Sequence, residues 1–354
     1  MAAVIDSPTH PQHLVPADGL TPVIALVLTA ADLQIDLVVQ SLASSSRRPD
    51  LVLVIERTGD RAPARELMAA LSDADLPSRL HELSRPVGLR EAVVLAVTQL
   101  DLADVFDARA GGALFWLIPP GTVPQPDTLR LLLDDWRRSP SVGMVGPKHV
   151  SAEDPTRLRS LGIHPTRAGR LVAMPAPGTP DQGQYDTTTD VLAVPLGGLL
   201  IEAELLEELR GWDGAFVDVA ADLDLGWRAQ RLGRRVVVSP RARMLTRPGI
   251  AIATADTALR RRSARMVALT RVSGWAVIPL MVWMAVTSVV GAVGLLLAKR
   301  PPGRPLAGLM PDPRLKAMLE MAPKDIPAPS RMDQPQVFPA EGVRRKETDR
   351  DSTG

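Results

Sequence analysis

The chain has 354 residues, of which 45% are hydrophobic, and a formal net charge of +1. This length holds one large α/β domain with an appendage, and the apolar fraction is enough for a sizeable core. The small net charge argues against nucleic acid as the main partner, because binding to a phosphate backbone needs a concentrated excess of Lys and Arg. The absence of cysteine excludes disulfide scaffolds, thiol catalysis and zinc sites with Cys ligands.

Composition divides the chain into five segments. Residues 1–20 are predicted to be a disordered tail, and they lack the continuous apolar core of a signal peptide. Residues 21–250 alternate apolar runs with amphipathic patterns and are predicted to form one domain. Residues 251–271 contain five arginines and are expected to form a basic juxtamembrane helix before the uncharged segment 272–298. Residues 299–354 are rich in Pro and charge and are predicted to be mostly disordered.

Apolar runs of strand length alternate with helical patterns in the first half of the domain. Strands buried on both faces and joined by helices imply a mainly parallel sheet with right-handed crossovers. The predicted fold class is therefore α/β, a Rossmann-like sheet with flanking helices, and ligands of such sheets bind at the carboxyl ends of the strands. The predicted strands are Val23–Leu28, Leu51–Ile55 and Ala113–Ile118, and the predicted helices are Leu33–Leu42, Ala62–Leu71 and Leu89–Leu100.

The uncharged segment 272–298 is long enough to cross a membrane. A helix of this length reaches roughly 40 Å, and the hydrocarbon core of a bilayer is roughly 30 Å thick. The arginines that precede it favour a cytoplasmic domain, although Lys299 and Arg300 on the far side weaken the charge asymmetry. The sequence thus predicts one transmembrane helix at the cell membrane, with a buried soluble helix or a helix in the membrane interface as alternatives.

Several short motifs lie between residues 211 and 247. They are Gly211-Trp-Asp213, Asp222-Leu-Asp224-Leu-Gly-Trp-Arg228, Gly233-Arg-Arg-Val-Val-Val238 and Pro240-Arg-Ala-Arg-Met-Leu-Thr-Arg247. In order and spacing they resemble the second half of a family 2 glycosyltransferase of the GT-A fold, in an actinobacterial, membrane-attached branch. The resemblance covers most of residues 21–250. It implies transfer of a sugar from a nucleotide-sugar donor to a glycan or lipid-linked acceptor.

The resemblance also implies roles for individual residues. It makes Asp222 the general base that deprotonates the acceptor hydroxyl, with Asp224 in support. Both aspartates are expected to open a helix that ends at Gly233, and capping of that helix is the alternative reason for their presence. The other implied residues are Glu56 and Asp60 for the nucleotide and Trp212 and Trp227 beside the acceptor, with core packing as the alternative for the two tryptophans.

The metal-binding motif of the family is degenerate in this chain. Where the family carries paired aspartates after a strand, this chain has Pro120 and Gly121, and Thr246 stands in the place of a later metal-supporting histidine. Pro and Gly offer no side-chain ligands, so we expect no metal cofactor; Mn²⁺ or Mg²⁺ would require other ligands. Three arginines near the last strand are candidates to hold the diphosphate instead, and contact with anionic lipid is the alternative. They are Arg241, Arg243 and Arg247.

Two functions are compatible with these observations. The first is a membrane-anchored glycosyltransferase that extends a cell-envelope or lipid-linked glycan at the cytoplasmic face, with weakened activity. The second is an inactive pseudo-glycosyltransferase that serves as a binding or assembly module alongside other envelope-biosynthesis proteins. A plain dinucleotide-binding Rossmann protein is disfavoured, because Thr29-Ala-Ala-Asp32 occupies the place of the Gly-x-Gly-x-x-Gly turn after the first strand.

Overall fold

A computed structural model describes most of the predicted domain and one later helix. The residues it describes are 4–5, 21–100, 112–165, 171–187, 190–214, 216, 219–247, 265–267, 269 and 277–299. The predicted disordered tails 1–20 and 299–354 lie almost entirely outside the described residues, as does most of the basic segment 251–271. Within the first tail, however, Val4 and Ile5 form a short strand that pairs with residues 80 and 81, so disorder was the wrong prediction for these two residues.

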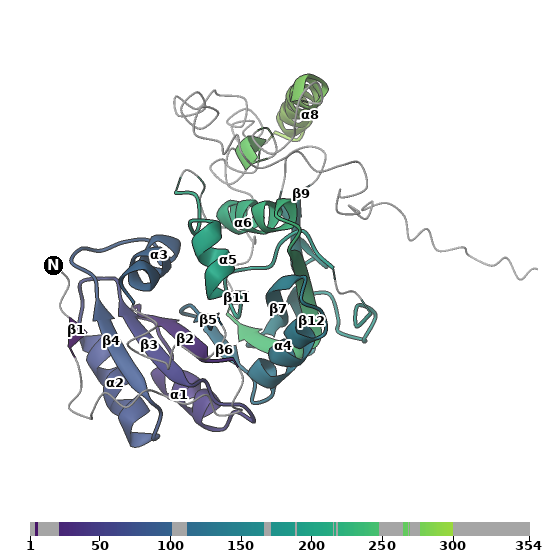
Figure 1. Cartoon of the computed structure of the whole chain (residues 1–354). Coiled ribbons are helices and arrows are strands. Elements are labelled where there is room, and N and C mark those ends of the chain that lie inside the picture. The colour runs from purple at the N-terminus through teal and green to yellow at the C-terminus, as the bar shows by residue number, and fades with distance from the viewer. Residues whose placement is uncertain are drawn as a thin grey trace, which may run out of the picture.

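A ten-stranded sheet forms the centre of the molecule (Figure 1). A separate two-stranded ribbon consists of β9 (Gly162–Pro165) and β10 (Leu171–Met174). The strands of the large sheet lie in the order β1 (Val4–Ile5), β4 (Ser78–Glu82), β3 (Leu51–Glu56), β2 (Val23–Leu28), β5 (Leu114–Ile118), β11 (Leu200–Glu202), β7 (Val142–Ser151), β12 (Arg235–Thr246) and β6 (Thr122–Pro124), and β8 (Leu158–Ser160) pairs with β7.

The sheet is mixed, which refines the predicted parallel arrangement. β2 is parallel to β3 and β5, β3 to β4, and β7 to β12. β11 lies antiparallel between β5 and β7. Two antiparallel steps restore the original direction, so the carboxyl ends of β2, β3, β5, β7 and β12 share one edge. We call this the carboxyl edge.

Helices cover both faces of the sheet, as Figure 1 shows. On one face lie α1 (Ile35–Ala43), α2 (Ala62–Asp73) and α4 (Thr128–Arg137); on the other lie α3 (Leu89–Gln99), α5 (Ala203–Glu208) and α6 (Val219–Arg231). β2 illustrates why. Val23, Ala25 and Val27 belong to the hydrophobic core on the side of α1, α2 and α4. Ile24, Leu26 and Leu28 belong to the core on the side of α3, α5 and α6. Alternate side chains point to opposite faces of a strand, so a continuous apolar run needs a helical layer on each side.

The helix α8 (Val277–Leu297) lies within the predicted membrane segment 272–298. Residues Ile278–Leu297 have a mean hydropathy of 2.2, and by length and composition they could cross a membrane. Large apolar side chains such as Val290 and Leu297 are exposed along it. One narrow face is buried instead: Met284, Ser288 and Ala292 recur at helical spacing, and the Ser288 hydroxyl accepts a hydrogen bond of 2.5 Å from Arg265.

Candidate functional site

The turn between β5 and β6 occupies the carboxyl edge of the sheet. Pro119, Pro120 and Gly121 are all buried. The Pro119 carbonyl accepts a hydrogen bond of 2.7 Å from the Thr122 hydroxyl, and the Gly121 carbonyl accepts one of 3.0 Å from the Arg247 amide. Gly121 has φ +73°, a left-handed conformation that glycine adopts without strain. The turn is thus a packed, internally bonded bend.

The structure brings together Pro120, Gly121 and Thr246, the three positions at which the resemblance places a degenerate metal motif. β6 pairs antiparallel with β12, which sets Thr246 opposite Thr122, directly after the Pro120-Gly121 turn. The sequence reasoning missed a fourth residue here, His149 on β7, whose Nδ1 lies 2.8 Å from the Thr246 hydroxyl. No sequence motif indicates His149, because its contact with Thr246 depends on the pairing of β7 with β12, which are remote in sequence.

His149 is a neutral, buried side chain at physiological pH. Burial lowers its pKa to about 4, and contact with the Gly197 backbone opposes this shift only in part. Gly197 allows the close packing, because a Cβ there would lie 3.2 Å from the imidazole Cε1 and 3.0 Å from the Thr122 methyl group. The loop before β11 therefore covers the turn and the histidine.

The side chains at this place do not fit a divalent metal ion. His149 can offer a metal ion only its Nε2, because its Nδ1 is hydrogen-bonded to the Thr246 hydroxyl. Pro120 and Gly121 have no side-chain atom that could bind a metal ion. Mn²⁺ and Mg²⁺ are bound in proteins mainly through oxygen ligands, of which carboxylates are the usual charged ones. Among the described residues, no group of three or more His, Cys, Asp or Glu side chains could hold a metal ion.

Glu56 ends β3 at the same edge, but its carboxylate is occupied. Oε1 accepts hydrogen bonds from the Thr58 amide at 2.6 Å, the Thr58 hydroxyl at 2.8 Å and the Gly59 amide at 2.8 Å. Oε2 accepts one of 2.7 Å from Thr29 at the end of β2. Asp60 accepts a hydrogen bond of 3.0 Å from the Ala62 amide at the start of α2. Both residues predicted to hold the nucleotide thus shape the loop after β3.

Asp222 lies within the first turns of α6, three residues after its start at Val219 rather than at the opening position expected from the sequence. Its carboxylate is 2% exposed. Oδ1 accepts hydrogen bonds from Arg90 Nε at 2.8 Å and Trp212 Nε1 at 3.0 Å. Oδ2 accepts them from Arg90 Nη2 at 2.6 Å and the Leu196 amide at 3.3 Å. These partners belong to other elements, so the carboxylate does not cap its own helix.

Asp224 is fully buried and pairs with Arg228 one turn later, with Arg228 Nε 2.7 Å from its Oδ2. The same guanidinium donates to the carbonyl oxygens of Leu209 and Gly211, which follow α5. Arg228 thus provides hydrogen-bond donors to two carbonyl groups just beyond the end of α5. Asp224 therefore orients an arginine that ties α6 to α5. Trp227 is half-buried and packs against the same core.

The three candidate arginines occupy two different places. Arg241 and Arg243 line a pocket of about 340 Å³, and Arg243 Nη2 lies 3.2 Å from Asp181 Oδ2. Lys148 in the same pocket is buried, with Nζ 3.1 Å from Asp181 and 2.6 Å from Asp186. Arg247 is separate: its amide bonds to Gly121, and its side chain is exposed. Arg247 is thus the candidate cation directly beside the Pro120-Gly121 turn.

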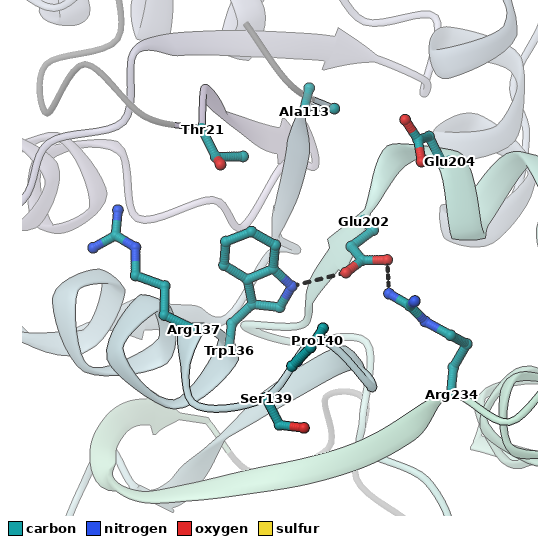
Figure 2. A pocket seen from close by; sticks show the side chains of 10 residues that line it. Thr21, Ala113, Trp136, Arg137, Ser139, Pro140, Glu202, Glu204 and Arg234 are labelled. Atoms are coloured by element: carbon teal, nitrogen blue, oxygen red, sulfur yellow. Dashed lines mark hydrogen bonds and ion pairs between the residues drawn. The ribbon is translucent and has the colours of Figure 1, made fainter.

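A cavity of about 550 Å³ lies at the opposite edge of the sheet (Figure 2). Its lining residues Thr21, Ala113 and Arg234 each precede a parallel strand, so the cavity lies at the amino ends. Figure 2 shows Trp136 and Arg234 converging on Glu202, with a hydrogen bond of 3.0 Å from the indole nitrogen. This cavity is remote from the residues predicted to act in catalysis.

Comparison with known proteins identifies the fold. No protein-family model matches the chain, and no curated protein matches it. A solved structure of GalNAc-T7 with UDP, GalNAc and Mn²⁺ superposes with a TM-score of 0.50 at 12% identity, covering 71% of this chain. The chain has a GT-A fold. It spans 49% of the length of the GalNAc-T7 chain and 42% of that of TarS from S. aureus.

The predicted fold class is therefore confirmed. TarS residues 1–349 in complex with UDP-GlcNAc give a TM-score of 0.47 at 12% identity, covering 75% of this chain and 71% of that one. The GalNAc-T7 structure supports the predicted likeness to GT-A glycosyltransferases at the level of fold. At this identity the roles of individual residues rest on the local geometry of this chain.

Proposed function

We propose that this chain is a membrane-attached pseudo-glycosyltransferase, a family 2 GT-A module of the actinobacterial branch that binds or assembles envelope-polysaccharide components and lacks metal-dependent sugar transfer. The observation that carries the proposal is the Pro119–Gly121 turn. It stands at the carboxyl edge, beside Thr246 and His149, in the position that the family resemblance gives to the metal ligands. The turn is buried, bonded through its own carbonyl groups and free of carboxylates.

The chemistry of sugar transfer makes this loss severe. Transfer needs charge stabilisation on the departing diphosphate, a base for the acceptor hydroxyl, and positioning of both partners. A divalent ion supplies the first and contributes several kcal/mol as a Lewis acid. A missing general base costs about 10² to 10⁴ in rate. A chain without the metal ligands retains the fold while losing the largest electrostatic contribution to turnover.

Attachment to a membrane is proposed through α8. Its span Ile278–Leu297 exposes most of its large apolar side chains, as expected of a surface that faces lipid. The arginine-rich segment 251–271 immediately precedes it in the sequence. By the positive-inside rule these arginines favour a cytoplasmic GT-A domain. Residues 21–250 would then form the module, with an acceptor glycan or lipid-linked intermediate presented at the membrane surface.

One observation favours a second candidate, a metal-independent transferase. The Arg247 amide donates a hydrogen bond to the Gly121 carbonyl, so an exposed arginine has its backbone next to the turn. A guanidinium binds phosphate oxygens bidentately and can neutralise a leaving diphosphate without a cation. Arg241 and Arg243 do not share this position, since Arg243 pairs with Asp181.

Titration of the purified full-length chain with UDP-, GDP- and dTDP-sugars, with and without Mn²⁺, tests both candidates. We expect no donor hydrolysis, no transfer to lipid-linked acceptors, and no change in donor affinity when Mn²⁺ is added. Mn²⁺-dependent tight binding with hydrolysis would contradict the proposal. Metal-independent turnover that is lost in Arg247→Gln and kept in the matched control Arg241→Gln would establish the second candidate instead.

A further inference from the structure

The carboxylate of Asp222 has no acceptor position left for a substrate. An ionised carboxylate has about four lone-pair sites. Arg90 Nε and Trp212 Nε1 take both sites of Oδ1, and Arg90 Nη2 and the Leu196 amide take both sites of Oδ2. We propose that Asp222 is a structural residue. Arg90 binds its carboxylate where the hydroxyl of an acceptor sugar would have to bind, so Asp222 does not act as a general base.

The geometry conflicts with the role of a general base. A base must reach the proton it removes at hydrogen-bond distance, through a free lone pair. Here a sugar hydroxyl would first have to displace Arg90, which binds both carboxylate oxygens at 2.8 and 2.6 Å. Such bidentate arginine-carboxylate pairs are among the strongest hydrogen-bonded contacts in proteins. Both side chains are largely buried, with exposed fractions of 14% for Arg90 and 2% for Asp222.

The four groups, which we call the Asp222 cluster, join three separate parts of the fold. Arg90 lies in the first turn of α3, Trp212 follows α5, and Leu196 lies in the loop before β11. Arg90 and Asp222 are 132 residues apart in the sequence. The cluster therefore links the half of the domain that begins with β2 to the half that ends with β12.

The cluster also acts on the degenerate metal position. The residue after Leu196 is Gly197, which packs against Thr122 and His149 beside the Pro120-Gly121 turn. The hydrogen bond from the Leu196 amide to Asp222 thus fixes the loop that covers this turn. The Asp222 cluster therefore occupies the proposed catalytic carboxylate and also holds the loop that packs over the Pro120-Gly121 turn. The inference rests on the proposed function, since it explains how the fold persists after catalysis is lost.

The test compares three variants of the full-length chain: Asp222→Asn, Arg90→Gln and Trp212→Phe. Removing one partner of a buried ion pair leaves the other charge uncompensated, so Asp222→Asn and Arg90→Gln should each lower the melting temperature by roughly 6 °C or more. Trp212→Phe removes one donor and should lower it less. Arg85→Gln is the matched control. It breaks a pair with Glu91 whose side chains are 64% and 47% exposed, and it should change the melting temperature by no more than about 2 °C.

Donor binding and turnover are measured on the same proteins. A melting temperature of Asp222→Asn within about 2 °C of the parent value would overturn the inference. So would a folded Asp222→Asn variant whose sugar transfer falls by about 10²-fold or more from a measurable parent rate, the signature of a lost base. Should either variant fail to fold, the small, graded loss expected for Trp212→Phe still decides, because an unperturbed melting temperature there contradicts the cluster. Turnover by the parent chain would refute the proposed function while leaving these stability outcomes to judge the cluster separately.

Discussion

Replacing Gly226 by Ala tests how α6 is held against the loop before β11. A Cβ at this position would lie 2.5 Å from the Leu192 carbonyl oxygen, 2.8 Å from the Ala193 Cβ and 2.9 Å from the Ala193 Cα. Ordinary carbon contacts are about 3.5 to 4.0 Å, and backbone atoms cannot rotate away as a flexible side chain does. Gly226 thus permits the close approach that brings Asp222 beside this loop.

The sign of the effect makes the experiment decisive. In a helix interior with free space, Gly→Ala stabilises by about 0.8 to 1 kcal/mol. Overpacking against a rigid neighbour costs about 1 to 3 kcal/mol, and contacts with backbone at this distance belong at the upper end. The net expectation is a loss of about 2 kcal/mol, which lowers the melting temperature by about 4 to 8 °C for a domain of this size.

Thermal unfolding of the detergent-purified chain, followed by circular dichroism, measures the change. Gly214→Ala is the matched control, because no atom lies within 4 Å of a Cβ added there. A Gly226→Ala variant as stable as the parent, or more stable, would refute the reasoning and show that α6 can move away from the loop.

Three other perturbations have defined outcomes. The pKa of His149 falls from about 6.5 in the unfolded chain to about 4 in the folded one, so its contribution of roughly 3 kcal/mol to stability is complete above pH 6.5 and is lost as the pH falls to 4. In His149→Asn the free energy of unfolding should therefore decrease less steeply between pH 6.5 and pH 4 than in the parent chain. Arg228→Met removes the cation that pairs with the buried carboxylate of Asp224 and should cost about 3 to 5 kcal/mol in urea unfolding. Joint replacement of Val286 and Val290 by Arg adds about 5 to 7 kcal/mol to membrane insertion and should move the chain to the soluble fraction on cell fractionation.

Controls separate these expectations from general damage. Arg130→Gln breaks only exposed pairs with Asp127 and Asp134 and should change stability by less than about 1 kcal/mol, so a similar loss in Arg228→Met would contradict the buried-pair argument. An unchanged acid limb in His149→Asn would assign the pH dependence to other groups, such as His164, whose pKa burial also lowers. Retention of the double Arg variant in the membrane fraction would exclude α8 as the anchor.

Much of the fold was readable from local patterns. The strand β2 matches its predicted bounds because six consecutive apolar residues, bounded by Pro22 and Thr29, leave no other way to bury both faces. The helices after it were found within a few residues at each end. β11 was missed, since three residues, Leu200–Glu202, are too few to show a period, and its antiparallel direction follows from pairing with β5 and β7.

The site divides in the same way. The sequence alone was sufficient to show that Pro120, Gly121 and Thr246 carry no carboxylate for a metal ion, because the chemical capacity of a residue is a property of its type. Only the tertiary structure shows that the loop after β3 donates hydrogen bonds to the Glu56 carboxylate and that His149 contacts Thr246. The same holds for the hydrogen bonds that Arg90 and Trp212 donate to the Asp222 carboxylate. The physical reason is that tertiary packing selects the partner of a buried polar group: 97 residues separate His149 from Thr246, and 132 separate Arg90 from Asp222. Contacts at such separations leave no local pattern in the sequence.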